Sequence, residues 1–331
     1  MPVQIPMTRW AVVTATFMLL GMVATVAADD IADCSQSAND ELRIRGCTSL
    51  IEGGAADAKS YYSRGLALYN LGDFRRAIVD YETYIERDPG NANAYYSRGL
   101  AFYKLGRIDR AIADFDKFIG LDPDNTDAYY SRGLALFNQG EIGRAIIDFD
   151  KFIEADPDNA DAYYSRGLVL YNQGDFERAV ADYDRYIELV PDYADAYYSR
   201  GLALFKLSDF GRAIADYDRY IEFVPDYADA YYSRGLALYN HGDLDRAIAD
   251  YDRYIGLEPD YAIAYFFRGS AYADKGEYDY AIADYSKAIE INPEYAIAYN
   301  NRSIAHHAKG DLDRAATDCD DARRLAPNTR C

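Results

Sequence analysis

The chain has 331 residues, is half hydrophobic by composition and carries a formal net charge of −20. That charge repels phosphate backbones and no basic stripe interrupts it, so we do not expect nucleic acid as a partner. Acidity also keeps a protein soluble, and it therefore identifies no partner by itself.

The N-terminal segment, residues 1–28, has the pattern of a secretory signal peptide. Arg9 precedes an uncharged stretch, Trp10–Ala28, which ends in small residues ahead of two aspartates. We expect cleavage after Ala28 and export to the periplasm or out of the cell. The alternative is an uncleaved anchor, because the uncharged stretch is just long enough to span a bilayer. The anchor would be the only membrane attachment.

Residues 29–57 precede a repeat pattern that begins at residue 58 and has a period of 34 residues. Counted back by one period, residues 40–52 align with the second helix of a repeat. Cys34 and Cys47 then fall on two helices that should face each other. We expect a capping half-repeat here, stapled by a Cys34–Cys47 disulfide, which suits an oxidising, exported compartment.

Residues 58–331 consist of eight tandem repeats of 34 residues. Glycine, or serine in the last copy, occupies residues 65, 99, 133, 167, 201, 235, 269 and 303, and proline occupies residues 89, 123, 157, 191, 225, 259, 293 and 327. A fixed period of this size indicates a repeat array, in which each unit buries its apolar face against its neighbours. Because no Pro-rich linker interrupts the pattern, we expect one elongated array.

The first copy, residues 58–91, defines the places of the repeat, with Ala58 at place 1. Places 1–14 lack proline and predict a first helix. Asp73 can cap a second helix over about residues 74–87. Each unit is therefore predicted to be a helical hairpin.

Recurring residues predict how the hairpin packs. Place 8 is glycine in seven copies, as in Gly65, where a second helix must approach closely, and place 20 is always alanine. Place 7 is arginine and place 23 aspartate in every copy, as in Arg64 and Asp80. We predict an ion pair that joins the two helices. The alternative is a row of arginines that binds an acidic ligand.

The C-terminal end carries the remaining cysteines. Cys319 is at place 24 of the last copy and Cys331 is the final residue. A Cys319–Cys331 disulfide would fasten the C-terminus, whereas a free Cys319 would be an ordinary core residue. His306 and His307 are adjacent, and neighbours on a helix point about 100° apart, so we expect no metal site. Since no phosphate loop, zinc motif or nucleophile elbow occurs, we expect neither a cofactor nor an enzyme.

The repeat resembles the tetratricopeptide repeat. It has an aromatic residue at place 4 in every copy, an aromatic at place 24 in all but the last, and proline at place 32 of each, besides glycine at place 8 and alanine at place 20. The resemblance implies an all-α fold, an α-solenoid in which about eight helix-turn-helix units form a right-handed superhelix. Six copies depart from the family at place 27, where tyrosine or phenylalanine replaces the usual alanine. The resemblance therefore implies looser or differently angled packing between neighbours there.

In that family the first helices line the concave side of the superhelix, and places 2, 5, 9, 12 and 13 contact the ligand. Places 5 and 12 here form a ladder of aromatic residues, next to asparagine or lysine at place 13. The resemblance implies as peptide-binding residues Tyr62, Tyr69, Asn70, Tyr96, Tyr103, Lys104, Tyr130, Phe137, Asn138, Tyr164, Tyr171, Asn172, Tyr198, Phe205, Lys206, Tyr232, Tyr239, Asn240, Phe266, Asn300 and Asn301. The last three belong to the two final repeats, which lack the tyrosine pattern. These repeats form either a separate subsite or a polar cap.

These residues predict a non-enzymatic interaction scaffold, whose aromatic-lined groove binds an extended segment of another protein. The alternative is an envelope accessory protein for glycan or polysaccharide export, because stacked tyrosines also suit the faces of sugars. A third possibility is an accessory subunit of an enzyme, without a site of its own.

Overall fold

The computed structural model describes residues 28–36 and 38–330, which form helices and connecting turns without a β-strand. Residues 1–27 of the predicted signal peptide lie outside the described part, as does Cys331. Within the described ranges, no helix combines the length and the apolar composition that a membrane span requires.

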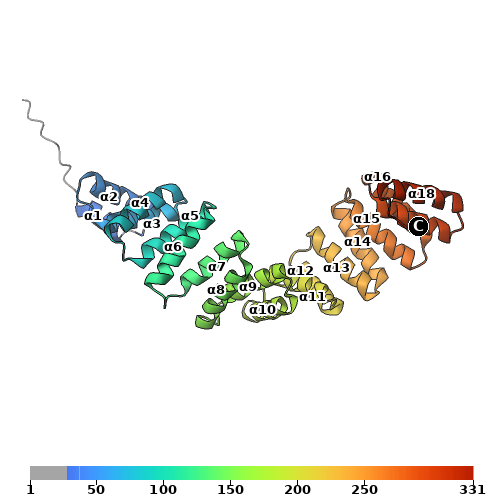
Figure 1. The fold of residues 1–331 in the computed structure, drawn as a ribbon, viewed down its shortest axis with the longest axis horizontal. Helices are drawn as coiled ribbons and strands as arrows, with labels where there is room; N and C mark the ends of the chain where they lie inside the picture. Colours follow the sequence, from blue (N-terminus) through green and yellow to red (C-terminus); the bar gives the residue numbers. More distant parts are fainter. Residues whose placement is uncertain (1–27, 37, 331) are drawn as a thin grey trace, which may run out of the picture. The chain divides into compact units, whose positions relative to one another are not determined.

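Eighteen helices occupy the described residues. They are α1 (Ala28–Gln36), α2 (Asp40–Glu52), α3 (Ala58–Asn70), α4 (Phe74–Arg87), α5 (Ala92–Lys104), α6 (Ile108–Leu121), α7 (Asp127–Gln139), α8 (Ile142–Ala155), α9 (Ala160–Gln173), α10 (Phe176–Leu189), α11 (Ala194–Lys206), α12 (Phe210–Phe223), α13 (Ala228–His241), α14 (Leu244–Leu257), α15 (Ala262–Asp274), α16 (Tyr278–Ile291), α17 (Ala296–Ala308) and α18 (Leu312–Leu325). From α3 on, odd-numbered helices are the first helices of the predicted repeats and even-numbered helices are the second (Figure 1).

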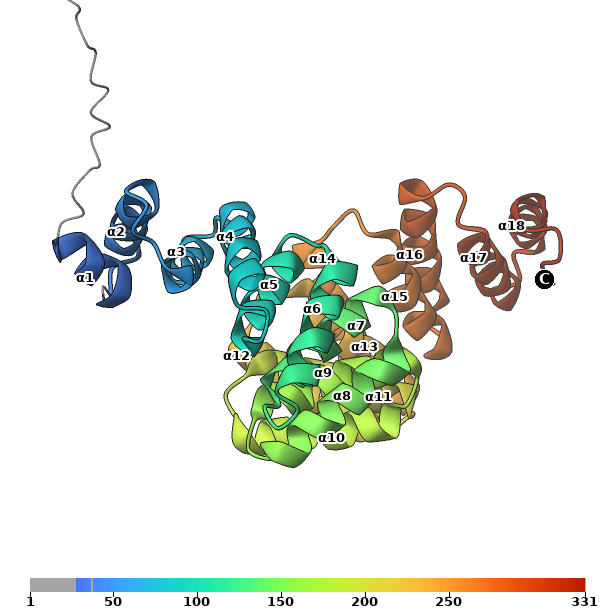
Figure 2. The same ribbon diagram turned by 60° about the vertical axis from the view of Figure 1, so that its left-hand side comes forward.

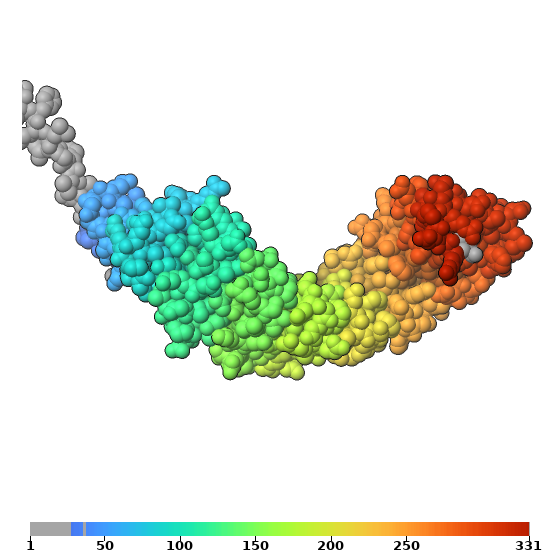
Figure 3. Space-filling model, viewed as in Figure 1, coloured from blue at the N-terminus to red at the C-terminus, as the bar shows by residue number. Residues whose placement is uncertain are grey.

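The chain divides after Leu121 into two compact units, one with α1–α6 and one with α7–α18. Within each unit, every helix packs against the helix before it and the helix after it, and successive odd-numbered helices also touch (Figures 1 and 2). On the face seen in Figure 3, the surface of each unit passes through the colours in sequence order. This consecutive packing confirms the predicted α-solenoid arrangement within each unit.

The turn inside each hairpin depends on two adjacent places. Place 15 has a positive φ in all eight repeats, and it is glycine except at Ser208, where φ is 60°. Glycine adopts this left-handed conformation without steric cost, which ends the first helix. In five repeats an aspartate at place 16 then caps the second helix, as where a carboxylate oxygen of Asp73 accepts from the backbone N–H of Arg76 at 3.1 Å.

In the first seven repeats, the core of the hairpin is a glycine that faces an aromatic ring. A β-carbon on Gly201, in α11, would lie 2.8 Å from Cε1 of Tyr217, in α12, and this ring is only 1% exposed. Equivalent close contacts recur from Gly65 to Gly269. The two helices approach this closely only because place 8 has no side chain, as the sequence predicts.

The aromatic residues at place 27 are buried. Their side chains are 1–7% exposed, and they are Tyr84, Phe118, Phe152, Tyr186, Tyr220 and Tyr254. Each packs against the place-5 tyrosine of its own repeat, with ring centroids 5.0–5.6 Å apart. The expectation of looser packing at place 27 is therefore wrong, because these rings are buried. The alternative expectation, a different angle between neighbouring repeats, stays a prediction.

The predicted ion pair between places 7 and 23 is present in all eight repeats. In the fifth repeat, Nε and Nη2 of Arg200 donate to the two carboxylate oxygens of Asp216 at 2.8 and 2.6 Å. The other pairs are Arg64–Asp80, Arg98–Asp114, Arg132–Asp148, Arg166–Asp182, Arg234–Asp250, Arg268–Asp284 and Arg302–Asp318. The aspartates are buried, so this two-point hydrogen bonding satisfies charges that would otherwise be costly.

The same arginine also contacts the preceding repeat, which the sequence pattern alone does not predict. Nη1 of Arg200 donates to Asp184, at place 25 of the fourth repeat, at 2.6 Å. Arginines 166, 234 and 268 make the equivalent ion pair. At the two ends the acceptor is a hydroxyl oxygen instead: Nη1 of Arg64 donates to Oγ1 of Thr48, and Nη1 of Arg302 donates to Oγ of Ser286. Each of these arginines therefore joins two repeats as well as two helices.

Before the first repeat, helices α1 and α2 are joined by the predicted disulfide. Cys34 in α1 and Cys47 in α2 are bonded, their Cα atoms are 4.6 Å apart, and both side chains are buried. Gly46 allows α2 to pass close to α1, because a β-carbon there would lie 2.6 Å from the backbone oxygen of Asp30. Helix α2 also packs on α3, which connects this cap to the repeats.

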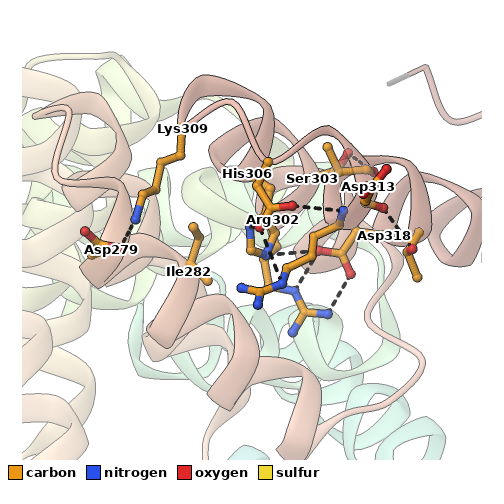
Figure 4. Close-up of polar contacts among 12 residues, drawn as sticks. Asp279, Ile282, Arg302, Ser303, His306, Lys309, Asp313 and Asp318 are labelled. Atoms are coloured by element: carbon orange, nitrogen blue, oxygen red, sulfur yellow. Dashed lines mark hydrogen bonds and ion pairs between the residues drawn. The ribbon is translucent and has the colours of Figure 1, made fainter.

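The last repeat replaces part of the aromatic core with polar contacts (Figure 4). At place 8, Oγ of Ser303 donates to the backbone oxygen of Ala315 at 2.6 Å, so the serine links α17 to α18. The buried His306 lies between two acidic groups, and its ring nitrogens are each 3.9 Å from an oxygen of Asp311 or Asp318.

Two further contacts of α17 and α18 concern the C-terminal end. Lys309 forms an ion pair with Asp279 of the preceding repeat (Figure 4). Cys319 is buried in α18 at place 24. Because Cys331 lies outside the described residues, the Cys319–Cys331 disulfide stays a prediction.

Candidate functional site

The candidate site is the surface that the odd-numbered helices carry at places 2, 5, 9, 12 and 13, which we call the A-face. We consider it separately in each of the two compact units. All the residues predicted to bind peptide lie on odd-numbered helices of the described part. Their exposure differs strongly from place to place.

The place-5 tyrosines are packed between repeats and are only half exposed or less. The ring of Tyr164 lies 5.7 Å from that of Tyr183 and 5.2 Å from that of Tyr186, both in α10. Its hydroxyl is 3.2 Å from Oγ of Ser199, in the first helix of the next repeat. Tyr62, Tyr130 and Tyr198 make the same hydroxyl contact. These four tyrosines therefore connect neighbouring repeats, whether or not they also contact a ligand.

In the last two repeats the predicted residues are more enclosed. Phe266 is only 7% exposed and packs against Tyr295 with ring centroids 5.2 Å apart. Asn300 and Asn301 are half-buried, and Oδ1 of Asn300 is buried without a hydrogen-bond partner. The structure thus brings these three residues into the packing of repeats seven and eight.

Among the residues predicted to bind peptide, those at places 12 and 13 are the most accessible in the first six repeats. The place-12 rings are half-buried. In three repeats a phenylalanine at place 17 contacts the ring edge-on, as where Tyr171 contacts Phe176 with centroids 5.3 Å apart. Place 13 is exposed in the first six repeats. Nδ2 of Asn172 donates to the backbone oxygen of Leu168 at 2.8 Å, and Asn240 makes the same contact with Leu236. These amides are thereby fixed in position next to a rigid aromatic ring.

One contact on the A-face joins two repeats through a carboxylate. The hydroxyl of Tyr239, at place 12 of the sixth repeat, donates to Asp274, at place 13 of the seventh. Burial, followed by this carboxylate, raises the pKa of Tyr239. The phenol therefore keeps its proton and serves as a hydrogen-bond donor.

A row of exposed tyrosines at place 34 does not follow from the sequence reasoning above. Tyr193, Tyr227 and Tyr261 are 39%, 39% and 47% exposed and directly precede α11, α13 and α15. The signal is present in the sequence, because place 34 is asparagine in the first three repeats and tyrosine in the next four. The sequence pattern does not identify these tyrosines as binding residues, because a place so close to the repeat proline indicates a turn.

These tyrosines lie beside the packed rings of the A-face. Tyr193 contacts Tyr164 edge-to-face, with centroids 5.7 Å apart, and contacts Tyr186 at 5.4 Å. Burial, then the Tyr164 phenol and the Asp195 carboxylate, raises the pKa of Tyr193 to about 12. Tyr193 is therefore neutral at physiological pH and can both donate and accept hydrogen bonds.

The described residues contain no group of three or more histidine, cysteine, aspartate or glutamate side chains that could hold a metal ion. The place-7 arginines, the alternative candidates for an acidic ligand, are already bonded to carboxylates. The A-face is thus the surface of interest, an aromatic and amide-bearing face made of repeated units.

Comparison with known proteins places the repeats in a family. Models described as tetratricopeptide repeat match residues 62–126, 101–160, 130–194, 164–228 and 198–262, and a model described as TPR repeat matches residues 269–310. No curated protein matches the chain.

Solved structures give the same result. The protein YrrB, described as a TPR protein with an unusual peptide-binding site, is 27% identical with a TM-score of 0.52, over 59% of this chain and 97% of YrrB. The C-terminal part of a TPR repeat-containing protein from Cytophaga hutchinsonii is 18% identical with a TM-score of 0.63, over 72% of this chain and 98% of that chain. A tetratricopeptide repeat protein from Parabacteroides merdae is 17% identical with a TM-score of 0.53, over 75% and 98%. The last two support the fold alone. Because the family models match residues 62–262 and 269–310, more than half of the chain, the chain belongs to the tetratricopeptide repeat family.

Proposed function

We propose that the protein is an exported, non-enzymatic scaffold that binds an extended peptide segment of a partner protein on its A-face. Tetratricopeptide repeat proteins act as protein–protein interaction scaffolds, and the finer statement for this chain rests on one observation. In the first six repeats, an aromatic ring at place 12 and an exposed asparagine or lysine at place 13 recur every 34 residues along the first helices.

The physical argument is that this pattern matches the needs of an extended backbone. A peptide in extended conformation presents a hydrogen-bonding group and a side chain at regular intervals, and an amide can pair with either an N–H or a C=O. A rigid ring beside each amide offers apolar contact at little cost in side-chain entropy. The likeness to YrrB, a TPR protein described as having a peptide-binding site, supports the same class of ligand.

Export is part of the proposal because the N-terminal pattern and the cap agree. Residues 1–28 have the composition of a signal peptide, and the Cys34–Cys47 disulfide suits an oxidising compartment. A periplasmic or extracellular partner is then expected.

The test compares peptides with sugars as ligands of the purified protein, by calorimetry. The A-face variant carries Asn172→Ala, Lys206→Ala and Asn240→Ala, three exposed positions at place 13. A control variant carries Glu154→Ala, Glu188→Ala and Glu222→Ala, which are exposed on second helices. We expect saturable peptide binding that weakens about tenfold or more in the A-face variant alone.

Two outcomes would overturn the proposal. Saturable binding of oligosaccharides without peptides would favour a glycan-handling protein, and binding of neither would favour an accessory subunit of an enzyme. Alanine at Tyr130, Tyr164 and Tyr198 would be a poorer test, because it would remove packing between repeats together with any ligand contact.

A further inference from the structure

The exposed tyrosines of the second compact unit alternate with aspartates of the same A-face. The row consists of Asp161, Tyr193, Asp195, Tyr227, Asp229 and Tyr261, and we call it the tyrosine–aspartate row. Its aspartates stand at place 2, in the first turn of the first helices, and its tyrosines at place 34, just before them. Each tyrosine therefore lies two residues before place 2 of the next repeat.

The tyrosines of the row are exposed and yet fixed. Tyr227 contacts Tyr198 with ring centroids 5.8 Å apart and Tyr220 with centroids 5.6 Å apart. Tyr261 contacts Tyr254 at 5.4 Å. Each ring thus presents an accessible face without the mobility of a surface side chain, which lowers the entropy lost on binding.

The aspartates of the row are exposed and lack a cationic partner. No lysine or arginine of the described residues forms an ion pair with Asp161, Asp195 or Asp229. Aspartates at place 25 behave differently, since Asp184 and Asp218 are each bound by an arginine of the next repeat. The fold therefore neutralises one set of recurring carboxylates and leaves the other open.

Phenols from two successive repeats lie near Asp195 and near Asp229. Burial first, and the carboxylate of Asp195 second, raise the pKa of Tyr220 to about 12. The same carboxylate adds to the raised pKa of Tyr186, after burial, Asp161 and Tyr164. Asp195 thus lies within electrostatic range of rings on both sides of it.

A structural role explains only part of this arrangement. A carboxylate in the first turn of a helix is stabilised by the helix dipole, which is reason enough for aspartate at place 2. It gives no reason for the exposed tyrosines at place 34, which the first three repeats replace with asparagine. Aspartate at place 2 and an exposed tyrosine at place 34 occur together only in the second unit.

Negative charge predominates on the A-face of the second unit. Places 2, 5, 9, 12 and 13 of repeats three to seven carry five aspartates, at residues 127, 161, 195, 229 and 274, and one cation, Lys206. The first unit differs, because the same places carry Lys59 and Lys104 and no carboxylate. A ligand that lies along repeats four to six therefore meets negative charge and aromatic rings together.

We propose that the tyrosine–aspartate row binds a cationic, lysine- or arginine-bearing extended segment of a partner protein. Each ammonium or guanidinium group would pair with a place-2 carboxylate and lie against the face of a place-34 ring, so that ion pairing and cation–π attraction act at one point. This inference rests on the proposed function and names the chemistry of its ligand.

The test measures binding of fluorescent octalysine, octaglutamate and a neutral glycine–serine octapeptide to the purified protein by polarisation. We expect octalysine to bind and octaglutamate not to bind, with affinity that falls as salt is raised because exposed charges are screened. The variant Asp161→Asn, Asp195→Asn, Asp229→Asn should weaken octalysine binding about tenfold to a hundredfold. The variant with glutamate at the same three positions keeps the charge and should restore binding.

The controls separate charge in general from this row. Glu154→Gln, Glu188→Gln and Glu222→Gln remove the same net charge from second helices and should leave octalysine binding within about twofold. Tyr193→Leu, Tyr227→Leu and Tyr261→Leu should weaken binding without any change of charge. Circular dichroism of each variant checks that the helices are intact.

The failures of the two proposals can be told apart. If the asparagine and the glutamine variants weaken octalysine binding equally, the peptide binds to overall negative charge, and the proposed role of the tyrosine–aspartate row is wrong. Saturable binding of neutral peptides without preference for octalysine would leave the proposed function standing and overturn this inference. Binding of maltoheptaose that depends on the three tyrosines and not on the aspartates would overturn both.

Discussion

At the scale of single residues, the arginine at place 7 has the largest structural role. Arg200 donates to Asp216 within its own repeat and to Asp184 in the preceding one. The carboxylate of Asp216 is buried, whereas that of Asp184 is partly exposed. Loss of the arginine would leave the buried carboxylate without a partner, which costs more than loss of a surface pair.

Arg200→Ala should therefore lower the free energy of unfolding by about 3–5 kcal/mol. The control is Arg219→Ala, because Arg219 is exposed, pairs with the exposed Glu222 and lies over the ring of Phe223, so its loss leaves no buried charge without a partner. It should change stability by about 1 kcal/mol or less. Urea denaturation followed by circular dichroism measures both. Similar values for the two variants would contradict the assigned role of Arg200.

The glycine at place 8 sets the distance between the two helices of a hairpin. Gly201→Ala should destabilise the protein by about 1–3 kcal/mol, because the new β-carbon would lie 2.8 Å from the ring of the buried Tyr217. Gly211→Ala is the control, since nothing lies within 4 Å of a β-carbon there and alanine favours a helix. The account fails here if denaturation midpoints of both variants move in the same direction.

At the scale of elements, the N-terminal cap depends on one covalent bond. Helix α1 has nine residues, and in the described part it packs only on α2 and α3. Cys34→Ala with Cys47→Ala should lower the free energy of unfolding by about 2–3 kcal/mol, because the bond closes a short loop.

Hydrogen exchange localises that effect. Amides of α1 and α2 should lose protection in the double alanine variant, whereas those of α11 and α12 should keep it, since repeat units are coupled mainly to their neighbours. Uniform loss of protection along the chain would contradict a local role of the cap.

The helices and the ion pairs could be predicted from the sequence because each depends on residues within one repeat. Glycine at place 15 and an acidic residue at place 16 mark the turn in most copies, and the pair Arg64 and Asp80 recurs at a fixed separation in all of them. The hydrogen bond from the place-7 arginine to the preceding repeat could not be predicted. Its acceptor at place 25 varies, as in Thr48, Asp184 and Ser286, and the distance between the two places is set by the packing between repeats.

The candidate site was only partly accessible to sequence reasoning, for the same reason. Whether Tyr164 binds a ligand or packs between repeats depends on two residues outside its own helix pair. Tyr193 lies in the turn before α11, and Ser199 lies in α11. Tyr193 itself was overlooked because its place holds asparagine in the first copies, where it indicates a turn. Exposure, which separates place 13 from place 5, appears only after the repeats are stacked.

At the scale of the whole molecule, the many packed phenols make stability depend on alkaline pH. Burial is the main cause that raises the pKa of Tyr193, Tyr220 and Tyr254 to about 12, above the ordinary value of about 10. A folded-state pKa above the unfolded value stabilises fully below pH of about 10, and this contribution disappears as the pH rises towards about 12.

We therefore expect cooperative unfolding between about pH 10 and 12, in which loss of helical circular dichroism coincides with the appearance of tyrosinate absorbance. A protein whose phenols all ionise near pH 10 while its helices persist would contradict the packed environment of these rings.

The central claim of the account is that the A-face binds an extended peptide, and site-specific photocrosslinking tests it most directly. A photoreactive residue replaces either Asn172, exposed at place 13 of the A-face, or Ile147, which is exposed on the second helix α8. Each protein is irradiated with the tightest peptide from the binding screen, and adducts are quantified by mass spectrometry. The account predicts peptide adducts at position 172 that unlabelled peptide competes away, and none at position 147; adducts at position 147 alone, or equally at both, would contradict it.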